Sequence, residues 1–245
     1  MLRPKRNTHQ LEFFPGGVPA GIIFDGQIDD ACHVAEVRPV DEADLREGIG
    51  AEFAFIALVA YFEGFCKNHT AALINICPPL VHSLAKHHRD INLSPVDILD
   101  HAQNLATNFG SLVVERLDFG TAKSINTFYG DLLGISPLSG QEAKRFHALL
   151  EDRHLIVHHG NIFTPAYAAE RFIRREVGRS RCFLDSLEVK PSDVRSAATF
   201  LQKLSAKIRV TSCRAVQAYT KKHGIRLASP NLRALDLLDD VAQTG

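Results

Sequence analysis

The sequence predicts an all-α fold: a helical bundle of five or six helices with a poorly structured N-terminal arm. Helix-start and helix-stop residues bracket several long segments, among them a capping box at Ser139 and Glu142 and a closing Gly160. A long apolar segment ends at Pro78 and Pro79, because proline cannot continue a helix. Hydrophobic residues make up 45% of the chain, which is enough for a packed core.

The overall composition indicates a soluble intracellular protein, which we expect in the cytoplasm. The basic start, MLRPKRNTHQ, is not followed by the apolar stretch of a secretory signal. The longest apolar run, 53–62, is shorter than the roughly 20 residues that cross a bilayer, so we expect no membrane partner. The five cysteines are scattered and never spaced as C-x-x-C, which favours reduced packing residues over disulfides or a zinc ribbon.

Residues 1–40 form the first of three expected parts of the chain. They are rich in Gly and Pro, with turn signals at 15–17 and Pro19 and a strand-like run at 22–24. We interpret them as a loosely structured arm, with a small hairpin as one option. A helical domain is expected over 41–225, and a C-terminal tail over 226–245.

The first helices of the domain follow from their end signals. Acidic residues at 41–47 suit a first helical turn, where the helix dipole favours negative charge. The helix that follows ends at Cys77 at the latest. It is apolar on nearly every side, which predicts a place in the centre of the bundle or at a subunit interface. A second helix starts with Ser94 as N-cap and Pro95 at its first position, and extends to about Arg116.

The later part of the chain predicts three or four further helices. A shorter helix over 121–134 closes at Gly134, and the capped segment 139–159 is the next one. Residues 161–190 are ambiguous, because they combine a helix-like stretch at 166–177 with a strand-like stretch at 181–189. The last long helix is expected over about 192–222, and the tail has the pattern of one more short helix.

One arginine interrupts the apolar side of the helix at 139–159. At about 100° per residue, one stripe carries Arg153 near its centre together with Phe146, Leu149, Leu150, Ile156 and Val157. A guanidinium in such a stripe is costly unless it is paired or faces a cleft. Two interpretations stay open: a structural arginine paired with a buried acid such as Glu63, or a functional arginine in a cleft.

Histidines collect on the flank and at the end of the same helix. His147, His154 and His158 line up at spacings of 7 and 4, near Glu151. Such a row can bind a transition metal, but HLIVH lacks the glutamate of H-E-x-x-H and spacing places no third ligand, so we expect no metal and no cofactor. The free carbonyls and the dipole at the helix end favour a charged imidazolium at His158 and His159. Such a group suits proton transfer at neutral pH.

These residues resemble a known signature. Arg153, a polar residue, three apolar residues and His158 are similar to the R-x4–6-H motif of the HEPN superfamily (higher eukaryotes and prokaryotes nucleotide-binding domains). INTFYGDLLGIS followed by RFHALLEDRHLIVHHGNI resembles the two helices that lead into this motif in bacterial ribonuclease-like HEPN groups. The resemblance covers roughly residues 42–222. Its specificity comes from the place of the motif at the end of a helix in an all-α chain.

The resemblance implies a metal-independent endoribonuclease that acts as a homodimer, with RNA cut in a composite cleft. The 2′-OH would attack the adjacent phosphate and leave a 2′,3′-cyclic end. By position, His158 would be the general base or acid, Arg153 would stabilise charge on the phosphoryl oxygens, and His154 would orient the site or contact phosphate. Glu63 and His159 would support them. A role as a toxin or defence effector, with a protein antitoxin as partner, is further implied.

The charge distribution permits an RNA partner. Residues 190–226 carry nine bases against one acid, and the last long helix aligns Lys203, Lys207, Arg214 and Lys221 at spacings of 4, 7 and 7. Either this stripe is a solvated helix face, or it binds RNA by tracking phosphates. Without interleaved aromatic residues, RNA contacts would be electrostatic and weak in sequence preference.

A non-catalytic HEPN-type module that binds a nucleotide, RNA or protein is the alternative function. It follows if Arg153 is a structural residue, because a motif does not by itself establish turnover. The two functions differ in what Arg153→Ala changes. Loss of a structural arginine lowers the melting temperature, whereas loss of a site residue lowers activity.

Overall fold

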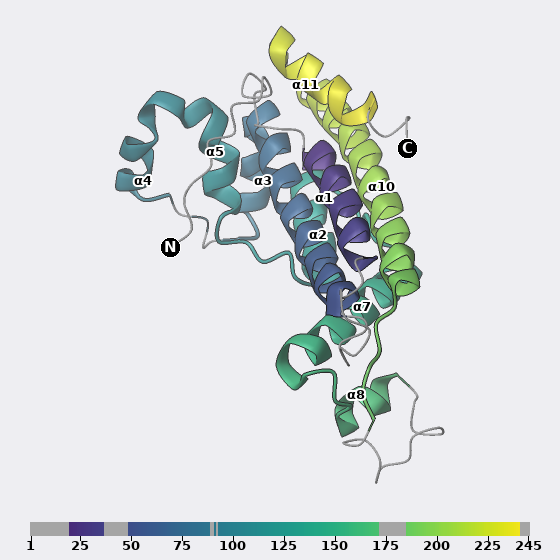
Figure 1. Cartoon of the computed structure of the whole chain (residues 1–245). Coiled ribbons are helices and arrows are strands. Elements are labelled where there is room, and N and C mark those ends of the chain that lie inside the picture. The colour runs from purple at the N-terminus through teal and green to yellow at the C-terminus, as the bar shows by residue number, and fades with distance from the viewer. Residues whose placement is uncertain (1–19, 37–48, 89–90, 92, 172–184, 241–245) are drawn as a thin grey trace.

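The chain folds as an all-α structure, as predicted (Figure 1). The computed structural model describes residues 20–36, 49–88, 91, 93–171 and 185–240. Within these ranges the only β-pairing is an isolated bridge between Ile162 and Ser186. The described residues contain ten α-helices, more than the predicted five or six, because short helices and an N-terminal helix add to the long ones. They are α1 (Ala20–Ala35), α2 (Ile49–Ile76), α3 (Val81–Ala85), α4 (Pro95–Asp100), α5 (Leu105–Val114), α6 (Ala122–Leu133), α7 (Gly140–His159), α8 (Pro165–Glu170), α10 (Pro191–His223) and α11 (Ser229–Asp240).

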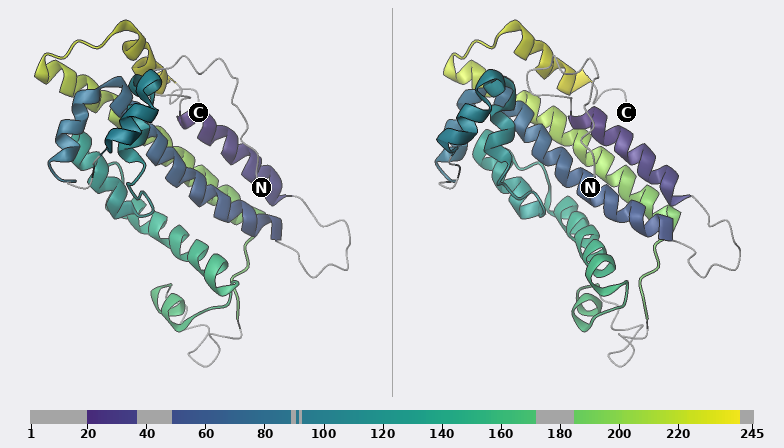
Figure 2. Two further views of the ribbon diagram at one scale, coloured as in Figure 1. Left: turned by 90° about the vertical axis from the view of Figure 1, so that its left-hand side faces the viewer. Right: turned by 60° about the vertical axis from the view of Figure 1, so that its left-hand side comes forward.

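Helix α2 is the central element of the bundle. It packs against α1, α5, α7, α10 and α11, and α1, α2 and α10 lie side by side in both views of Figure 2. Its end at Ile76, directly before the 3-10 helix η2 (Pro78–Leu80), confirms the predicted stop. By length and composition the whole of α2 could also cross a membrane. The uninterrupted apolar run at 53–62, considered alone in the sequence, is too short for that. Such a helix is weak evidence for a membrane span, because core helices of soluble proteins share that length and composition, and 44% of the most apolar window of α2 is buried in the bundle.

The N-terminal segment contains a helix where the sequence predicted a strand-like run. Residues 22–24 lie inside α1, so that part of the prediction is wrong. Helix α1 buries Phe24, Ile28, Ala31 and Ala35 against the bundle, at helical spacings that the nearby proline and glycine signals obscured. The rest of the predicted arm, 1–19 and 37–40, lies outside the described residues.

The predicted helix from Pro95 to Arg116 is divided in two. Helix α4 ends at Asp100, the 3-10 helix η3 (Ala102–Asn104) follows, and α5 begins at Leu105. The described side chains of α4 are exposed, whereas α5 buries Gly110, Val113 and Val114, so no continuous apolar stripe holds one long helix. Gly110 lets α5 approach the backbone of α2 closely, because an added Cβ would lie 2.0 Å from the carbonyl oxygen of Ala71.

The remaining helix predictions agree with the structure. Helix α6 ends at Gly134 with a positive φ of 71°, and α10 and the tail helix α11 lie where they were expected. In the ambiguous region the structure has the short helix α8 and, near the predicted strand, only the bridge at Ser186. Residues 172–184 lie outside the described residues.

The centre of the bundle contains a group of buried polar side chains. His69 of α2 is fully buried, with its ring stacked between Phe65 and Tyr129 at centroid distances of 5.5 and 6.2 Å. Burial, reinforced by the positive charge of Arg209, lowers the pKa of His69 from 6.5 to about 3. Arg209 of α10 is also buried and lies 3.6 Å from the Asp25 carboxylate of α1. These groups join three helices and keep His69 neutral at physiological pH.

Candidate active site at the end of helix α7

Both ends of α7 are capped as the sequence predicted. The Ser139 hydroxyl accepts a hydrogen bond from the Glu142 amide, and a Glu142 carboxylate oxygen accepts one from the Ser139 amide. At the other end Gly160 adopts a left-handed conformation with φ of 56°. Asn161 follows with φ of 68°, which is rare for a residue with a side chain. Two successive left-handed residues therefore turn the chain sharply after the motif.

The Asn161 side chain fastens this turn to α2. Its Nδ2 donates a 2.6 Å hydrogen bond to Oε1 of Glu52, in the first turn of α2. Nearer the other end of α7, Phe146 packs edge-on against Phe62 of α2 at a centroid distance of 5.2 Å. These two contacts hold α7 antiparallel to α2, with the end of the motif beside the start of α2.

Three histidines gather at the end of α7. The ring centroids of His154 and His158 lie 4.6 Å apart, and those of His154 and His159 lie 5.5 Å apart. All three residues are exposed. We call His154, His158 and His159 the imidazole cluster. Its exposed ring nitrogens are accessible to a molecule that binds on the surface, and imidazoles are the side chains used most often for proton transfer.

Arg153 lies on the α2 side of α7 and is only partly exposed. This agrees with its predicted place in the apolar stripe of the helix. Its Nε is buried and has no hydrogen-bond partner among the residues that the structure describes. The charge of Arg153 influences Glu63 of α2. Burial raises the pKa of the Glu63 carboxyl, the positive charge of Arg153 opposes this rise, and the negative charge of Asp118 adds to it. The positive charge of Arg153 therefore acts on Glu63, but the structure has no ion pair between these two described side chains.

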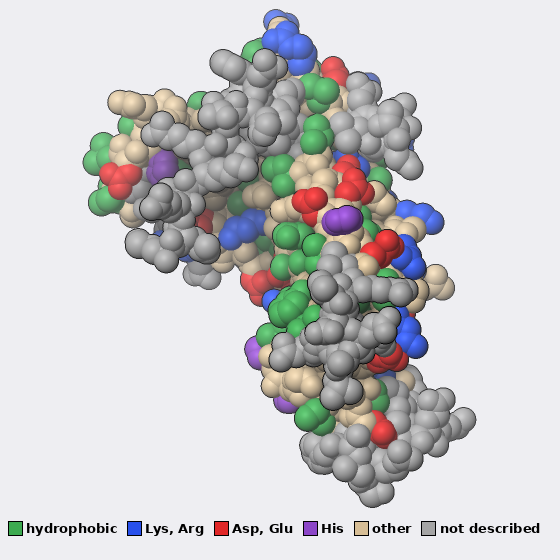
Figure 3. All heavy atoms as spheres, in the orientation of Figure 1, with side chains coloured by type: hydrophobic (Ala, Val, Ile, Leu, Met, Phe, Trp, Pro, Cys, Tyr) green, Lys and Arg blue, Asp and Glu red, His purple; other side chains and the backbone are tan. Residues whose placement is uncertain are grey.

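Apolar side chains are exposed around the cluster. Phe53 is 63% exposed, Val157 46%, Ile162 45% and Ile49 43%. We call these four residues the apolar patch. They lie at the two helix ends that the Glu52–Asn161 bond joins. In Figure 3, hydrophobic and histidine side chains lie next to one another at the lower left of the molecule. The sequence predicted Val157 in the apolar stripe of α7, and its exposure shows that this prediction is wrong.

Leu155 and Ile156 bury the other sides of this helix end. Leu155, which the wheel left off the apolar stripe, packs in a small cluster with Phe163 and Tyr167 of the α8 region. The Tyr167 hydroxyl donates a 2.6 Å hydrogen bond to Asp152, which raises the pKa of Tyr167 on top of the larger effect of burial. Helix α8 is in this way attached to the face of α7 that carries Asp152.

His147 has a partner that the sequence did not place. Its Nε2 lies 2.6 Å from Oε1 of Glu170 at the end of α8, although the His147 side chain is 54% exposed. Glu151, one turn along α7, is close to both, and the ligand atoms of the three side chains lie within 4.8 Å of one another. Glu170 comes from another helix, so no spacing rule within 139–159 could find it.

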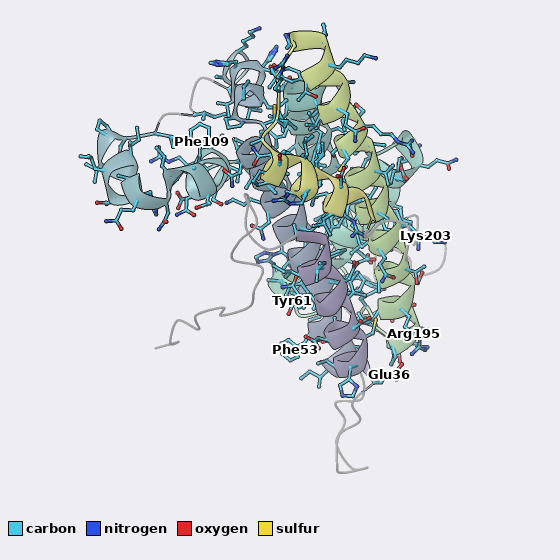
Figure 4. All side chains as sticks on the ribbon, turned by 90° about the horizontal axis from the view of Figure 1, so that it is seen from above. Glu36, Phe53, Tyr61, Phe109, Arg195 and Lys203 are labelled. Atoms are coloured by element: carbon cyan, nitrogen blue, oxygen red, sulfur yellow. The ribbon has the colours of Figure 1, made fainter. Side chains whose placement is uncertain are left out.

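The basic stripe on α10 does not converge on the imidazole cluster. Lys207 forms a 2.6 Å ion pair with Glu142 in the first turn of α7, about 24 Å along the helix axis from His158 at 1.5 Å per residue. Arg214 and Lys221 follow on α10 still further from its start and are exposed, as is Lys203. In Figure 4, Lys203 and the Arg195–Glu36 ion pair lie on one side of α1, and Phe53 and Tyr61 lie on the other.

Among the described residues, Arg153, His154 and His158 line none of the three main hollows of the molecule. A cavity of about 640 Å³ lies between α5 and α6, lined by residues that include Val113, Arg116, Lys123 and Phe128. No residue of α7 lines it. A substrate of the imidazole cluster would therefore lie on the surface, or in a cleft that a second molecule completes.

No protein-family model, curated protein or solved structure matches the chain.

Proposed function

We propose that this protein is a metal-independent endoribonuclease of the HEPN type, a toxin or defence effector that acts as a homodimer. The observation that supports this function is the arrangement at the end of α7. Arg153 carries an unpaired, buried Nε, and the exposed rings of His154, His158 and His159 follow within the next two turns. The same helix end thus supplies a cation and several imidazoles, which are the kinds of group that phosphodiester cleavage by a neighbouring hydroxyl needs.

The proposed reaction is a transfer of the phosphoryl group within RNA. One imidazole, which we assign to His158, takes the proton from the 2′-OH as its oxygen bonds to phosphorus. The bond from phosphorus to the 5′-oxygen breaks, and a second imidazole donates a proton to that oxygen. The products are a 2′,3′-cyclic phosphate and a 5′-hydroxyl. The Arg153 guanidinium stabilises the negative charge that grows on the phosphoryl oxygens. His154 and His159 orient the phosphate, and Glu63 holds Arg153 in place.

A second copy of the chain is the proposed partner at this face. The apolar patch lies directly beside the imidazole cluster and exposes four large side chains, and such a surface favours association. A two-fold axis through the patch would bring two Arg153 and His158 pairs to one cleft. Mixing Arg153→Ala protein with His158→Ala protein should then restore part of the cleavage, since mixed dimers of a composite site keep one intact set of groups.

The exposed cations of α10 remain expected RNA contacts away from the chemistry. Lys203, Arg214 and Lys221 are free to meet phosphates, whereas Lys207 is already paired with Glu142. A protein that uses them binds RNA with a strong dependence on salt and little sequence preference.

A non-catalytic HEPN-type module for nucleotide, RNA or protein binding is the second candidate. It is favoured by the partial burial of Arg153 and by the effect of its charge on Glu63, which a structural arginine would also have. The two candidates separate on turnover, because only the first consumes RNA.

The test is incubation of purified protein with a mixed RNA pool in excess EDTA, followed by mass spectrometry of the new ends. We expect fragments with 2′,3′-cyclic phosphates, and no cleavage of the same sequences made with 2′-deoxyribose. Binding without cleavage supports the non-catalytic module instead. Cleavage of the deoxy strands, or activity that EDTA abolishes, excludes the proposed chemistry.

A further inference from the structure

The flank of α7 that carries the imidazole cluster also carries a second group of chemically useful side chains, nearer the start of the helix. His147 and Glu151 are four residues apart on α7 and so share one face of the helix. Glu170, the last residue of α8, lies against them, with its Oε1 2.6 Å from Nε2 of His147. Their three ligand atoms all lie within 4.8 Å of one another.

The position of Glu170 does not depend on His147 alone. The next residue, Arg171, donates a 2.9 Å hydrogen bond to Asp152 of α7, and Tyr167, one turn earlier on α8, donates to the other oxygen of the same carboxylate. Thr164 caps the start of α8 by accepting a hydrogen bond from the Tyr167 amide. Helix α8 is therefore held on α7 by contacts that bring Glu170 to His147 and Glu151 in advance.

The chemistry of these three groups is that of a cation site. One imidazole nitrogen and two carboxylates carry two negative charges in total, which a divalent ion neutralises. Zinc binds histidine nitrogen and glutamate oxygen at about 2.0–2.2 Å, so two ligand atoms of a tetrahedral ion are about 3.4 Å apart. This separation is compatible with the observed cluster after small rotations. Such rotations are open to these side chains, since His147 is 54% and Glu170 48% exposed.

We propose that His147, Glu151 and Glu170 bind a divalent transition-metal ion of the zinc class, with water in the fourth position. A nitrogen ligand favours such an ion over Mg²⁺ and Ca²⁺, which prefer oxygen ligands only. The ion joins the end of α8 to α7. It takes no part in the proposed RNA cleavage, because His147 is eleven residues, or about 16 Å along the axis, from His158.

The experiment is a titration of the untagged full chain with Co²⁺, followed by its visible absorption, and with Zn²⁺, followed by calorimetry. We expect about one ion per chain and a tetrahedral Co²⁺ spectrum. His147→Ala and Glu170→Gln should each weaken binding about ten-fold or more. Glu188→Gln removes an exposed carboxylate elsewhere and should bind as the wild type does. Zn²⁺ should also raise the melting temperature of the wild type but not of Glu170→Gln.

Three results would overturn the site. The first is that the wild type binds the metal ion no better than Glu170→Gln does, and the second is that all variants bind it equally. The third is that binding is lost in His154→Ala and His158→Ala but kept in His147→Ala. The last result assigns the ion to the imidazole cluster. All of the substituted residues lie at the surface, so we expect each variant to fold. Melting temperatures measured without metal check this. RNA cleavage by Glu170→Gln, measured in EDTA, separates this proposal from the proposed function, since the variant should cleave RNA as the wild type does.

Discussion

His69 makes the stability of the protein sensitive to pH in a way that can be calculated. The buried ring has a pKa of about 3 in the folded protein, against an ordinary value of 6.5. Below pH 6.5 the unfolded chain therefore binds a proton that the folded protein rejects. Linkage makes the sign definite: the contribution of His69 is fully present above pH 6.5 and is lost as the pH falls towards 3.

The size of the effect follows from the gap between the two pKa values. Each pH unit inside the window from 6.5 to about 3 removes about 1.4 kcal/mol of unfolding free energy for one proton. At pH 4.5 the loss should be about 3 kcal/mol, a large fraction of the 5–15 kcal/mol that is typical of a domain. The contacts with Phe65 and Tyr129 keep the ring away from water, which is why the protonated form finds no compensation.

The assay compares wild type with His69→Phe by urea unfolding at several pH values between 4 and 7.5. The variant has no titrating ring, so the stability difference, wild type minus variant, should fall with a slope of about 1.4 kcal/mol per pH unit below pH 6. The slope is informative even if the larger Phe side chain shifts both curves by a constant amount. A difference that does not change with pH would refute the reasoning, as would wild type gaining on the variant in acid.

Five further substitutions at four positions test other parts of the structure. Gly110→Ala should lower the unfolding free energy by about 3 kcal/mol or more, since its Cβ would lie 2.0 Å from the α2 backbone. The exposed control Gly26→Ala should instead raise it by about 0.5–1 kcal/mol, and thermal unfolding of both variants measures the difference. Asn161→Ala should lower the unfolding free energy by about 2 to 3 kcal/mol, because it loses the hydrogen bond to Glu52 and places alanine at a positive φ. Asn161→Gly should lower it by only about 1 to 2 kcal/mol, because glycine adopts a positive φ without strain; equal losses in urea unfolding would contradict this. Glu63→Gln should be more stable than wild type at pH 7. The raised pKa of Glu63 stabilises the wild type below pH 4.5, and this contribution is lost as the pH rises through the folded-state pKa. If the variant were still more stable than wild type in acid, the result would contradict the burial of Glu63.

Local signals in the sequence were sufficient for most helix ends. The caps at Ser139 and Gly160 and the stop at Pro78 depend on backbone hydrogen bonds within a few residues, and the structure has all of them. Helix α1 was missed because Pro and Gly immediately upstream suggested turns, although Phe24, Ile28, Ala31 and Ala35 already repeat with a helical period. The break after Asp100 was missed because the end signals of 95–116 say nothing about burial between them.

The candidate site divides along the same line. A helical wheel was enough to place Arg153 on the α2 side and to align His154 with His158, because both facts concern one helix. Contacts between helices were beyond it. Glu170 reaches His147 from α8, Glu52 reaches Asn161 from α2, and Lys207 is paired with Glu142 instead of standing free. Each of these depends on how the helices pack, which residue spacing does not encode.

The central claim is that Arg153 and His158 act together to cleave RNA, and cleavage rates in EDTA test it most directly. Wild type should cut a fluorescent RNA, and Arg153→Ala and His158→Ala should each be slower by about 10²-fold or more. Arg145→Ala, eight residues earlier on α7 and stacked over Phe200, should keep the wild-type rate. All four proteins should have similar melting temperatures. A His158→Ala protein that cleaves as fast as wild type, or a folded wild type that leaves the RNA intact, would contradict the account.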